Sequence, residues 1–347
     1  MKPIAIHQNK QKFDHSTSWS YVWIDYCEKN NISYEIVDCF QLDIINKLKD
    51  FGCLLWHFSG YSYRDMLFAR SILYSAKQMG LKIFPDFDDA WHFDDKIAET
   101  YLLESVDAPI PLSYIFHSYN DIKKWIEEYD KFPLVAKLKS GSGSHNVKLI
   151  KSKNELLSYA RQMFGNGYSS SPSVLGKAKA NYQSSKGNKA LMMSRIKRIP
   201  EFYRTWRSSR QFPNEKSYVF LQEFVPNDGY DLKIVVVGDK LGFICRHTRQ
   251  NDFRASGGGN IYFDKTLIIK NIIDSAFLTS DKLDFQCMGY DYVVDSKTGT
   301  GKIVEISYGF SHQALLQSGG YFDRKGIWHD ESFNAPEELL KNMIVDE

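Results

Sequence analysis

Two carboxylates stand among apolar residues in the segment Gly289–Phe310, and together they could hold a metal ion. Asp291 lies at the start of one short apolar run and Glu305 lies within a second, and a turn rich in Gly, Ser and Thr joins the two runs. Both runs are typical of β-strands, in which successive side chains point to opposite faces. Acids on adjacent strands can converge on one divalent cation, and carboxylate oxygens suit magnesium. The pattern leaves a second interpretation open, in which the acids lie at the sheet surface or pair with Lys or Arg.

A lysine followed by a Gly/Ser-rich stretch forms a second candidate site. Lys137 lies in the apolar run 132–139, and the stretch Ser140–Asn146 separates it from another apolar run, Val147–Ile150. We expect a β-hairpin whose Gly/Ser tip binds phosphate oxygens through backbone N–H groups and hydroxyls, while the lysine supplies positive charge. The spacing is not that of a P-loop, G-x-x-x-x-G-K-[ST], and no helix follows the stretch directly. A turn without a ligand remains the alternative.

Positive charge is concentrated between Arg161 and Lys216. This segment holds twelve Lys and Arg but two Glu, a net charge of +10, so the rest of the chain carries −8. Aromatic residues are interleaved with the basic ones, and no long apolar periodicity is present, which indicates an inserted, partly helical element. The insertion is either a solvated or partner-bound segment, or a platform for a polyanionic acceptor such as an acidic glycan, a nucleotide-linked precursor or RNA.

Length and composition place the chain among globular proteins. The 347 residues predict two or three domains, and 43% hydrophobic and 25% charged residues are ordinary values for a soluble protein. The five cysteines form no C-x-x-C pair, so we expect buried free thiols, with neither a zinc site nor disulfides. The N-terminus lacks the apolar core of a signal peptide, and no apolar run approaches membrane length. We therefore expect a cytoplasmic protein without a membrane span.

The first 92 residues alternate short apolar runs with amphipathic ones. This pattern predicts an α/β fold that begins with a small, doubly wound, mostly parallel sheet. No G-x-G-x-x-G follows the first predicted strand, Pro3–His7, which argues against a dinucleotide site. The acidic cluster 86–89, together with Asp94-Asp95, fits a loop, a helix N-terminus or the edge of a substrate site, and we favour a solvated turn.

The order of these motifs resembles that of the ATP-grasp superfamily of carboxylate–amine ligases, specifically its RimK-like branch. The similarity covers about residues 95–310, and residues 1–92 resemble the small α/β domain that precedes the ATP-grasp domain. It implies a two-lobed ATP-grasp domain over 93–312, with the basic insertion at about 161–216, and a C-terminal tail and helix over 313–347. The motifs are, in order, Asp95-Lys96 at the start of a helix, Lys137 with its Gly/Ser loop, the hinge strand Gln222–Val225, Asp231 with Lys233, Arg246, Arg254 with the Gly run after it, Gly289–Asp291 and Val304–Ser307.

The resemblance implies a nucleotide site built from three groups of residues. Two lysines, Lys96 and Lys137, would contact the phosphates of ATP. A flexible loop would close over the phosphates, formed by Ser140, Gly141, Ser142, Gly143 and Ser144. The adenine hinge would be formed by Gln222, Glu223, Phe224 and Val225, followed in the chain by Asp231.

The resemblance also implies catalytic and metal-binding residues. Arg246 and Arg254 would neutralise the γ-phosphate and the acyl phosphate, with Lys233 at the position where the family often has Arg. Magnesium would be bound by Asp291, Glu305 and Ser307. The family usually has Asn where Ser307 stands, and a hydroxyl is the weaker ligand, which puts the number of metal ions in doubt.

The resemblance therefore implies an enzyme that uses ATP and Mg²⁺ to join a carboxylate to an amine through an acyl phosphate. The basic segment favours an acidic sugar or amino acid as substrate, as in surface-polysaccharide biosynthesis. Three alternatives remain: a ligase that adds amino acids to a peptide or protein end, a non-catalytic ATP-binding module, and an RNA-binding protein. Of the partners, we least expect a nucleic acid, and the sequence leaves a homo-oligomer open.

Overall fold

The computed structural model describes residues 2–8, 18–60, 62–141, 146–170, 213–248 and 261–345. The chain divides into two compact units. Unit 1 comprises Met1–Ser59, Arg64–Pro111 and Val225–Glu347, and unit 2 comprises Gly60–Tyr63 and Leu112–Phe224. The three-part division at residues 92 and 312, implied by the resemblance, stays a prediction.

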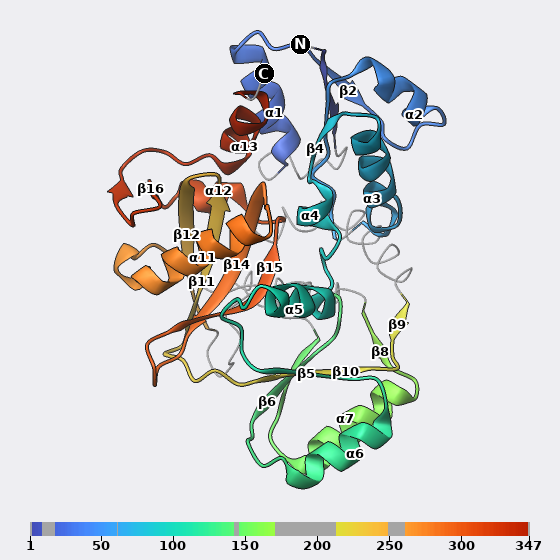
Figure 1. Ribbon diagram of the computed structural model, residues 1–347, viewed down its shortest axis with the longest axis vertical. Coiled ribbons are helices and arrows are strands. Elements are labelled where there is room, and N and C mark those ends of the chain that lie inside the picture. The colour runs from blue at the N-terminus through green and yellow to red at the C-terminus, as the bar shows by residue number, and fades with distance from the viewer. Residues whose placement is uncertain are drawn as a thin grey trace, which may run out of the picture. The chain divides into compact units, whose positions relative to one another are not determined.

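A parallel sheet in unit 1 begins the fold. Its strands lie in the order β2 (Tyr34–Val37), β1 (Ile4–His7), β3 (Cys53–Leu55) and β4 (Lys82–Phe84). The helices α1 (Trp19–Lys29) and α3 (Tyr63–Gln78) lie on opposite sides of this sheet, as right-handed crossovers in opposite directions require (Figure 1). Between β2 and β3 the chain forms α2 (Ile44–Lys47) and a 3₁₀ turn, η1 (Leu48–Asp50). The predicted doubly wound, parallel N-terminal sheet is confirmed.

The acidic cluster 86–89 forms a helix N-terminus, which was one of the alternatives, and not the solvated turn that we favoured. Asp86 caps the short helix α4 (Phe87–Ala90), and Asp89 in this helix is completely buried. The Asp89 carboxylate accepts hydrogen bonds from the backbone N–H groups of Cys287, at 3.1 Å, and Gln286, at 3.3 Å. Burial raises the pKa of Asp89 well above its usual value, and these hydrogen bonds offset part of that increase. This cluster therefore joins two parts of unit 1 that are distant in sequence.

The larger sheet of unit 1 is antiparallel. Its described strands run in the order β15 (Gly301–Ser307), β14 (Cys287–Val294), β11 (Tyr230–Val237), β12 (Lys240–His247), β16 (Tyr321–Phe322) and β17 (Trp328–His329), and β13 (Ile261–Tyr262) also pairs with β12. The helix α11 (Lys270–Lys282) packs against β11 and β14 (Figure 1). Two tyrosines of β14 fix this contact, because the Tyr290 and Tyr292 hydroxyls hydrogen-bond to Ser280 and Ser275 of α11. One face of the sheet is therefore part of the core.

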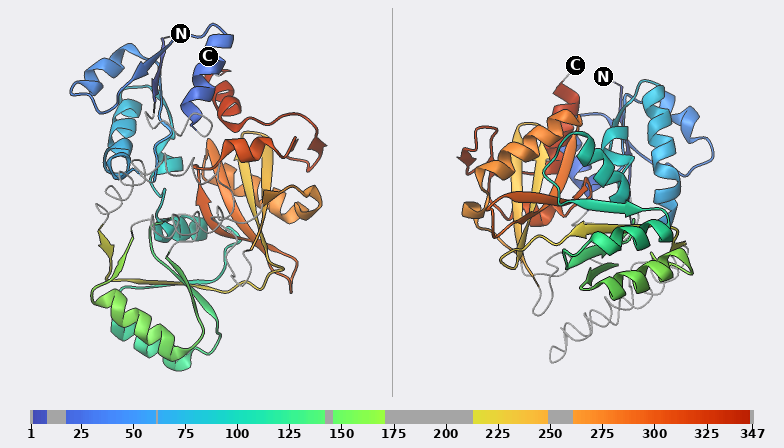
Figure 2. Two further views of the ribbon diagram at one scale, coloured as in Figure 1. Left: turned by 180° about the vertical axis from the view of Figure 1, so that it is seen from behind. Right: turned by 60° about the horizontal axis from the view of Figure 1, so that its bottom comes forward.

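The C-terminal helix packs on the N-terminal part of unit 1. The helix α13 (Ala335–Val345) lies beside α1 in the views of Figure 2. The Trp23 indole N–H donates to the carbonyl of Pro336 at 2.9 Å, and the Lys82 ammonium donates to the carbonyl of Met343 at 2.7 Å. The described part of unit 1 also contains α5 (Lys96–Ser105), α12 (His312–Leu316) and the 3₁₀ turn η2 (Lys265–Leu267).

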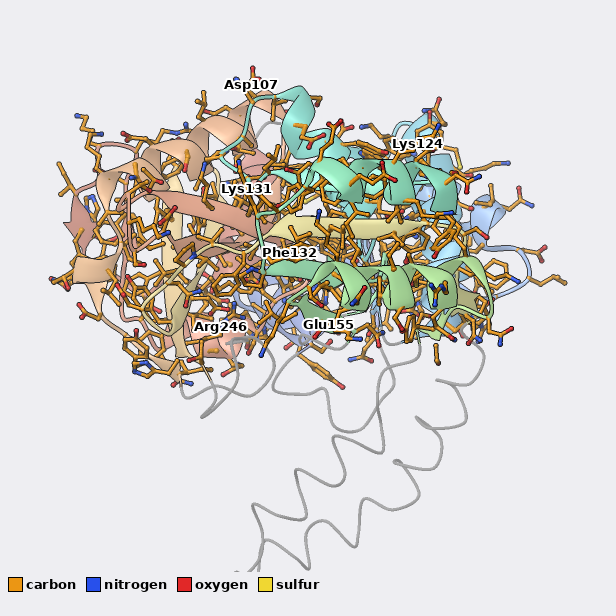
Figure 3. The ribbon with its side chains drawn as sticks, turned by 90° about the horizontal axis from the view of Figure 1, so that it is seen from below. Asp107, Lys124, Lys131, Phe132, Glu155 and Arg246 are labelled. Atoms are coloured by element: carbon orange, nitrogen blue, oxygen red, sulfur yellow. The ribbon has the colours of Figure 1, made fainter. Side chains whose placement is uncertain are left out.

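Unit 2 is a small antiparallel sheet covered by a pair of helices. The sheet order is β5 (Ser113–Phe116), β10 (Val219–Glu223), β6 (Leu134–Lys137) and β7 (Val147–Ile150), and a separate ribbon pairs β8 (Tyr168–Ser169) with β9 (Asn214–Glu215). The helices α6 (Tyr119–Glu128) and α7 (Lys153–Phe164) lie side by side (Figure 3, where Lys124 of α6 and Glu155 of α7 are labelled). The predicted hairpin of 132–139 and Val147–Ile150 is present as the β6–β7 pair.

One boundary differs from the sequence-based prediction. Asp291 lies in the middle of its strand rather than at the start, because β14 already pairs with β11 from Cys287 onward. The prediction that the cysteines are buried free thiols is confirmed for all five. None of the helices in the described part of the chain combines the length and apolar character that crossing a membrane takes.

Candidate functional site

One face of the larger sheet in unit 1 gathers most of the acidic and basic residues singled out in the sequence. In the strand register, Asp231 lies opposite Arg246, Lys233 lies opposite Asp291, and Asp291 lies opposite Glu305. Directly opposed residues of an antiparallel pair point to the same face of a sheet. The five side chains therefore share the face opposite the one that packs on α11. The prediction that the two acids lie on adjacent paired strands is confirmed.

A β-bulge in β15 makes this arrangement compatible with the core. The register skips Val304, since Asp291 pairs with Glu305 whereas the next residue, Tyr292, pairs with Ile303. Ile303 and Ile306 are both buried, although strict alternation would place residues three apart on opposite faces. The extra residue restores the alternation, so that both isoleucines face the core while Glu305 faces the charged side.

The carboxylates of this face are paired with cationic side chains. Arg246 makes a bidentate ion pair with Asp231, with Nε–Oδ1 and Nη2–Oδ2 distances of 2.6 and 2.9 Å. The Asp291 Oδ1 atom lies 2.6 Å from Lys233 Nζ and 3.0 Å from Arg246 Nη2. The four side chains are almost completely removed from solvent. Desolvated charges of this kind are stable only when they are paired.

The pairing shifts the pKa values of the partners in opposite directions. Burial alone would raise the pKa of Asp291, but the charges of Arg246 and Lys233 lower it below its usual value. For Arg246, burial would lower the pKa, but the charges of Asp291 and Asp231 raise it. Burial raises the pKa of Asp231 to about 6, although Arg246 opposes the increase. Of the two aspartates, Asp291 is therefore the one that this face holds more firmly in its charged form.

The helix α5 adds a cation and an acid beside Glu305. Asp95 caps α5 through a hydrogen bond from the N–H of Ala98, and this places Lys96 in the first turn. Lys96 Nζ lies 3.6 Å from Glu305 Oε1, and its side chain is buried. One turn further on, Glu99 is also buried and accepts a hydrogen bond of 3.2 Å from the N–H of Ile306. Burial, together with the charge of Glu305, raises the pKa of Glu99 well above its usual value.

The donor set fits a magnesium ion that shares its shell with other ligands. Asp291 and Glu305 face each other across paired strands, so their oxygens can bind one small cation. In the described residues no group of three or more His, Cys, Asp and Glu is placed to bind a metal. Magnesium commonly completes its shell with water and substrate phosphates, so two carboxylates are enough. Ser307 lies opposite Gly289, and its hydroxyl donates to the carbonyl of Gly309 at 3.2 Å and accepts from the N–H of Gly309 at 3.0 Å.

In unit 2, Lys137 and the predicted hinge lie on neighbouring strands. Lys137 ends β6, is buried, and lies opposite Phe220 of β10. Glu223 ends β10, and its carboxylate accepts hydrogen bonds from the hydroxyls of Tyr114, at 3.2 Å, and Tyr129, at 3.5 Å. Gln222 before it is buried and donates to the hydroxyl of Ser113 at 3.2 Å. The side chain of Glu223 is thus held by tyrosines of its own unit. The chain passes from unit 2 to unit 1 between Phe224 and Val225.

The residues after Lys137 are held by an acid that the sequence analysis did not single out. The Glu215 carboxylate of β9 accepts hydrogen bonds from the backbone N–H groups of Lys139 and Ser140 and from the Ser140 hydroxyl. No sequence pattern predicts this contact, because 75 residues separate Ser140 from Glu215. Glu99 was missed too, although its spacing of three from Lys96 places both on one face of a helix.

Some of the predicted residues lie outside the described part of the chain. They are Ser142, Gly143 and Ser144 of the Gly/Ser loop, Arg254 with the Gly run after it, and residues 171–212 of the basic segment. Their predicted roles stay predictions.

Known structures identify the fold. No protein-family model matches the sequence, and no curated protein sequence matches it. Solved structures match along its whole length. A RimK-domain ATP-grasp protein of Sphaerobacter thermophilus has a TM-score of 0.54 at 13% identity, covering 99% of each chain. D-alanine–D-alanine ligase of Bacillus anthracis has a TM-score of 0.56 at 14% identity, covering 100% of this chain and 96% of that one. The ATP-grasp ligase PsnB, in a complex with a minimal precursor, Mg and ADP, has a TM-score of 0.53 at 9% identity, covering 99% and 97%.

The chain therefore has the ATP-grasp fold, and the fold that the resemblance implied is confirmed. The RimK-domain protein is one of the structures that it resembles over full length, at low sequence identity.

Proposed function

We propose that this protein is an ATP-dependent carboxylate–amine ligase that uses magnesium. The observation that carries the proposal is the ionic face of the larger sheet, where Asp291 and Glu305 face each other on paired strands with Lys233 and Arg246 around them. The ATP-grasp fold supports the assignment, since ligases are among the proteins that share it.

The reaction class follows from the chemistry of a carboxylate. A carboxylate is a poor electrophile, so the γ-phosphoryl group of ATP is first transferred to it, giving ADP and an acyl phosphate. An amine then attacks the acyl carbon, the C–O bond to phosphate breaks, and amide, phosphate and a proton are released. Two anions must approach each other in the first step, and the charges of Lys233 and Arg246 reduce their repulsion.

In this proposal each group of residues has a separate task. Asp291 and Glu305 hold magnesium, which supplies charge neutralisation at the phosphates when bound. Lys96, buried beside Glu305, and Lys137, at the end of β6, bind phosphate oxygens. The hinge residues Gln222–Val225 bind adenine through their backbone, because the side chains of Gln222 and Glu223 are already engaged within unit 2.

The substrates are a finer part of the proposal. The net charge of +10 between Arg161 and Lys216 supports an acidic acceptor, and an acidic sugar or amino acid of surface-polysaccharide biosynthesis is our first candidate. A peptide acceptor is the second candidate, and the similarity to PsnB, a ligase solved in a complex with its precursor peptide PsnA2, favours it.

The test measures ADP release with magnesium and a panel of acidic sugars, amino acids and acidic peptides. It compares the wild type with Glu305→Gln, which keeps the shape of the side chain but removes its charge. Asp274→Asn is the matched control, because Asp274 is an exposed acid paired only with Lys270 one turn away on α11. We expect ADP and an amide product with one carboxylate–amine pair, about 100-fold slower in Glu305→Gln and unchanged in Asp274→Asn.

Equal ADP release from the wild type and Glu305→Gln would contradict the metal assignment. Tight ATP binding without ADP release for every pair would favour a non-catalytic nucleotide-binding module. Mass spectrometry of the product separates the two acceptor candidates, since an amide on a sugar or amino acid and an addition to a peptide differ in mass.

A further inference from the structure

Glu215 accepts several hydrogen bonds from the residues that follow Lys137. Its Oε2 atom lies 2.8 Å from the N–H nitrogen of Lys139, and its Oε1 atom lies 3.0 Å from that of Ser140. The Ser140 hydroxyl donates to Oε1, and the Tyr218 hydroxyl donates to Oε2. The N–H of Lys139 is shared with the Tyr218 hydroxyl oxygen, at 2.7 Å. Both carboxylate oxygens therefore bind the start of the Gly/Ser loop.

Two tyrosines lie beside this partly buried carboxylate. Tyr218 is 8% exposed, and burial, then the charge of Glu215, raises its pKa above the usual value, so it stays a hydrogen-bond donor. Tyr168 lies opposite Glu215 in the β8–β9 ribbon and stacks on Tyr159 of α7 at 5.3 Å between ring centroids. The Tyr218 side of this set of hydrogen bonds is therefore shielded from water, where hydrogen bonds are stronger.

The backbone that carries Glu215 is itself fixed to α7. The N–H of Ser217 donates to the carbonyl of Met163 at 2.8 Å, and the Gln162 side chain donates to the carbonyl of Gly167 at 2.8 Å. Gly167 has φ +71°, and a Cβ atom there would lie 2.2 Å from the carbonyl oxygen of Glu215. Only glycine allows the two strands of the ribbon to approach this closely. The backbone on either side of Glu215 is therefore held by its hydrogen bond to α7 and by its close contact with Gly167.

We infer that Glu215 is a positioning residue for nucleotide binding: it anchors the first turn of the Gly/Ser loop through Lys139 and Ser140. The inference rests on the proposed function and on the prediction that the Gly/Ser loop after Lys137 binds the phosphates of ATP. Ser140 then binds Glu215 rather than phosphate, because both its N–H and its hydroxyl are already used.

The physical effect is preorganisation. Ordering a stretch of backbone around a ligand costs conformational entropy. Because Glu215 fixes residues 139 and 140 before ATP binds, that cost is smaller, and the benefit appears as affinity for the nucleotide. Glu215 also stands at the end of the chain segment that runs from β8 to β9 and contains most of the +10 charge. The same residue therefore links the base of the basic segment to the base of the loop.

The experiment is isothermal titration calorimetry, in which a non-hydrolysable ATP analogue is titrated into the full-length protein in the presence of magnesium. It needs no acceptor substrate. We expect Glu215→Gln, in which an amide NH₂ replaces one acceptor oxygen, to bind about tenfold more weakly. Ser140→Ala should weaken binding by a smaller factor. Glu128→Gln, the same charge change at an exposed end of α6, should bind like the wild type.

A double variant separates positioning from direct contact with phosphate. If Ser140 acts through Glu215, then Ser140→Ala has no further effect in the Glu215→Gln background, whereas a phosphate-binding hydroxyl would give additive losses. Thermal melts identify a variant that fails to fold, in which case Tyr218→Phe replaces it as the probe of the same carboxylate.

Unchanged or tighter binding by a folded Glu215→Gln, or additive losses in the double variant, would overturn the inference. Failure of the proposed function looks different, because the wild type itself would then not bind the ATP analogue with magnesium.

Discussion

Two carboxylate sites in this molecule are stabilised in opposite ways. In unit 1, the charge of Asp291 is balanced by the cations of Lys233 and Arg246. In unit 2, Glu215 is held by neutral donors, which are backbone N–H groups and hydroxyls such as that of Ser140. A carboxylate in an ion pair can exchange one cation for another, whereas neutral N–H groups offer no such exchange and fix the backbone instead. The first arrangement suits a site that binds a metal, and the second suits a support.

The largest effect should come from neutralising the ion-paired carboxylate. Asp291→Asn removes the charge that balances Lys233 and Arg246 and removes one of the two proposed magnesium ligands. We expect ADP release to fall by about 100- to 1,000-fold, which steady-state kinetics at saturating magnesium measures. Asp274→Asn is again the control. If Glu215→Gln lost as much turnover at saturating ATP as Asp291→Asn, the proposed difference between a metal-binding site and a supporting site would be wrong.

A smaller effect is expected from the support of Glu215. Gly167→Ala places a Cβ against the carbonyl oxygen of Glu215 and forces a non-glycine residue into a positive φ. We expect a loss of about 2–3 kcal/mol in the free energy of unfolding, measured by urea denaturation. Gly80→Ala is the matched control, because Gly80 has φ +89° but open space around its Cβ position, so only the backbone cost of about 1 kcal/mol should remain. Equal losses for the two variants would mean that the ribbon adjusts without strain.

The smallest effect should come from Glu99, which among the described residues has no cationic partner as close as Lys233 and Arg246 are to Asp291. Because the pKa of Glu99 is raised on folding, the folded state binds its proton more tightly than the unfolded state does. The free energy of unfolding therefore decreases as pH rises above the usual pKa of a Glu, about 4.5. Glu99→Gln keeps the acceptor for the N–H of Ile306 but removes the titration. It should gain about 1 kcal/mol relative to wild type between about pH 5 and about pH 8, measured as melting temperatures. Glu104→Gln, exposed on the same helix, should show the wild-type slope, and an unaltered slope in Glu99→Gln would show that Glu99 ionises normally.

The sequence predicts the parts of the fold that depend on local periodicity. The N-terminal parallel sheet, the β6–β7 hairpin and the facing pair Asp291–Glu305 all follow from the alternation of apolar runs and the short connections between them. The resemblance supplied Lys233 and Arg246, because motif order carries information that spacing within one segment does not. Which cation pairs with which acid depends on strand register, and no single motif specifies it.

Contacts between distant segments could not be predicted. Asp89 was expected in a solvated turn because a run of acids is usually solvated. Its carboxylate instead accepts hydrogen bonds from the N–H groups of Cys287 and Gln286, almost 200 residues away. Glu215 and Glu99 are likewise defined by partners remote in sequence, Ser140 and Ile306. In each case a single carboxylate is buried by tertiary structure, against the local preference of its residue type for water.

The bulge at Val304 shifts the alternation of side chains between the two faces of β15 by one residue. Before the bulge, Ile303 of β15 pairs with Tyr292, and after it Glu305 pairs with Asp291. A strand that kept all its residues but lacked the bulge would turn Glu305 toward the helix α11 and Ile306 toward the charged face. The bulge, rather than the side chain at 304, therefore decides which face of the sheet Glu305 occupies.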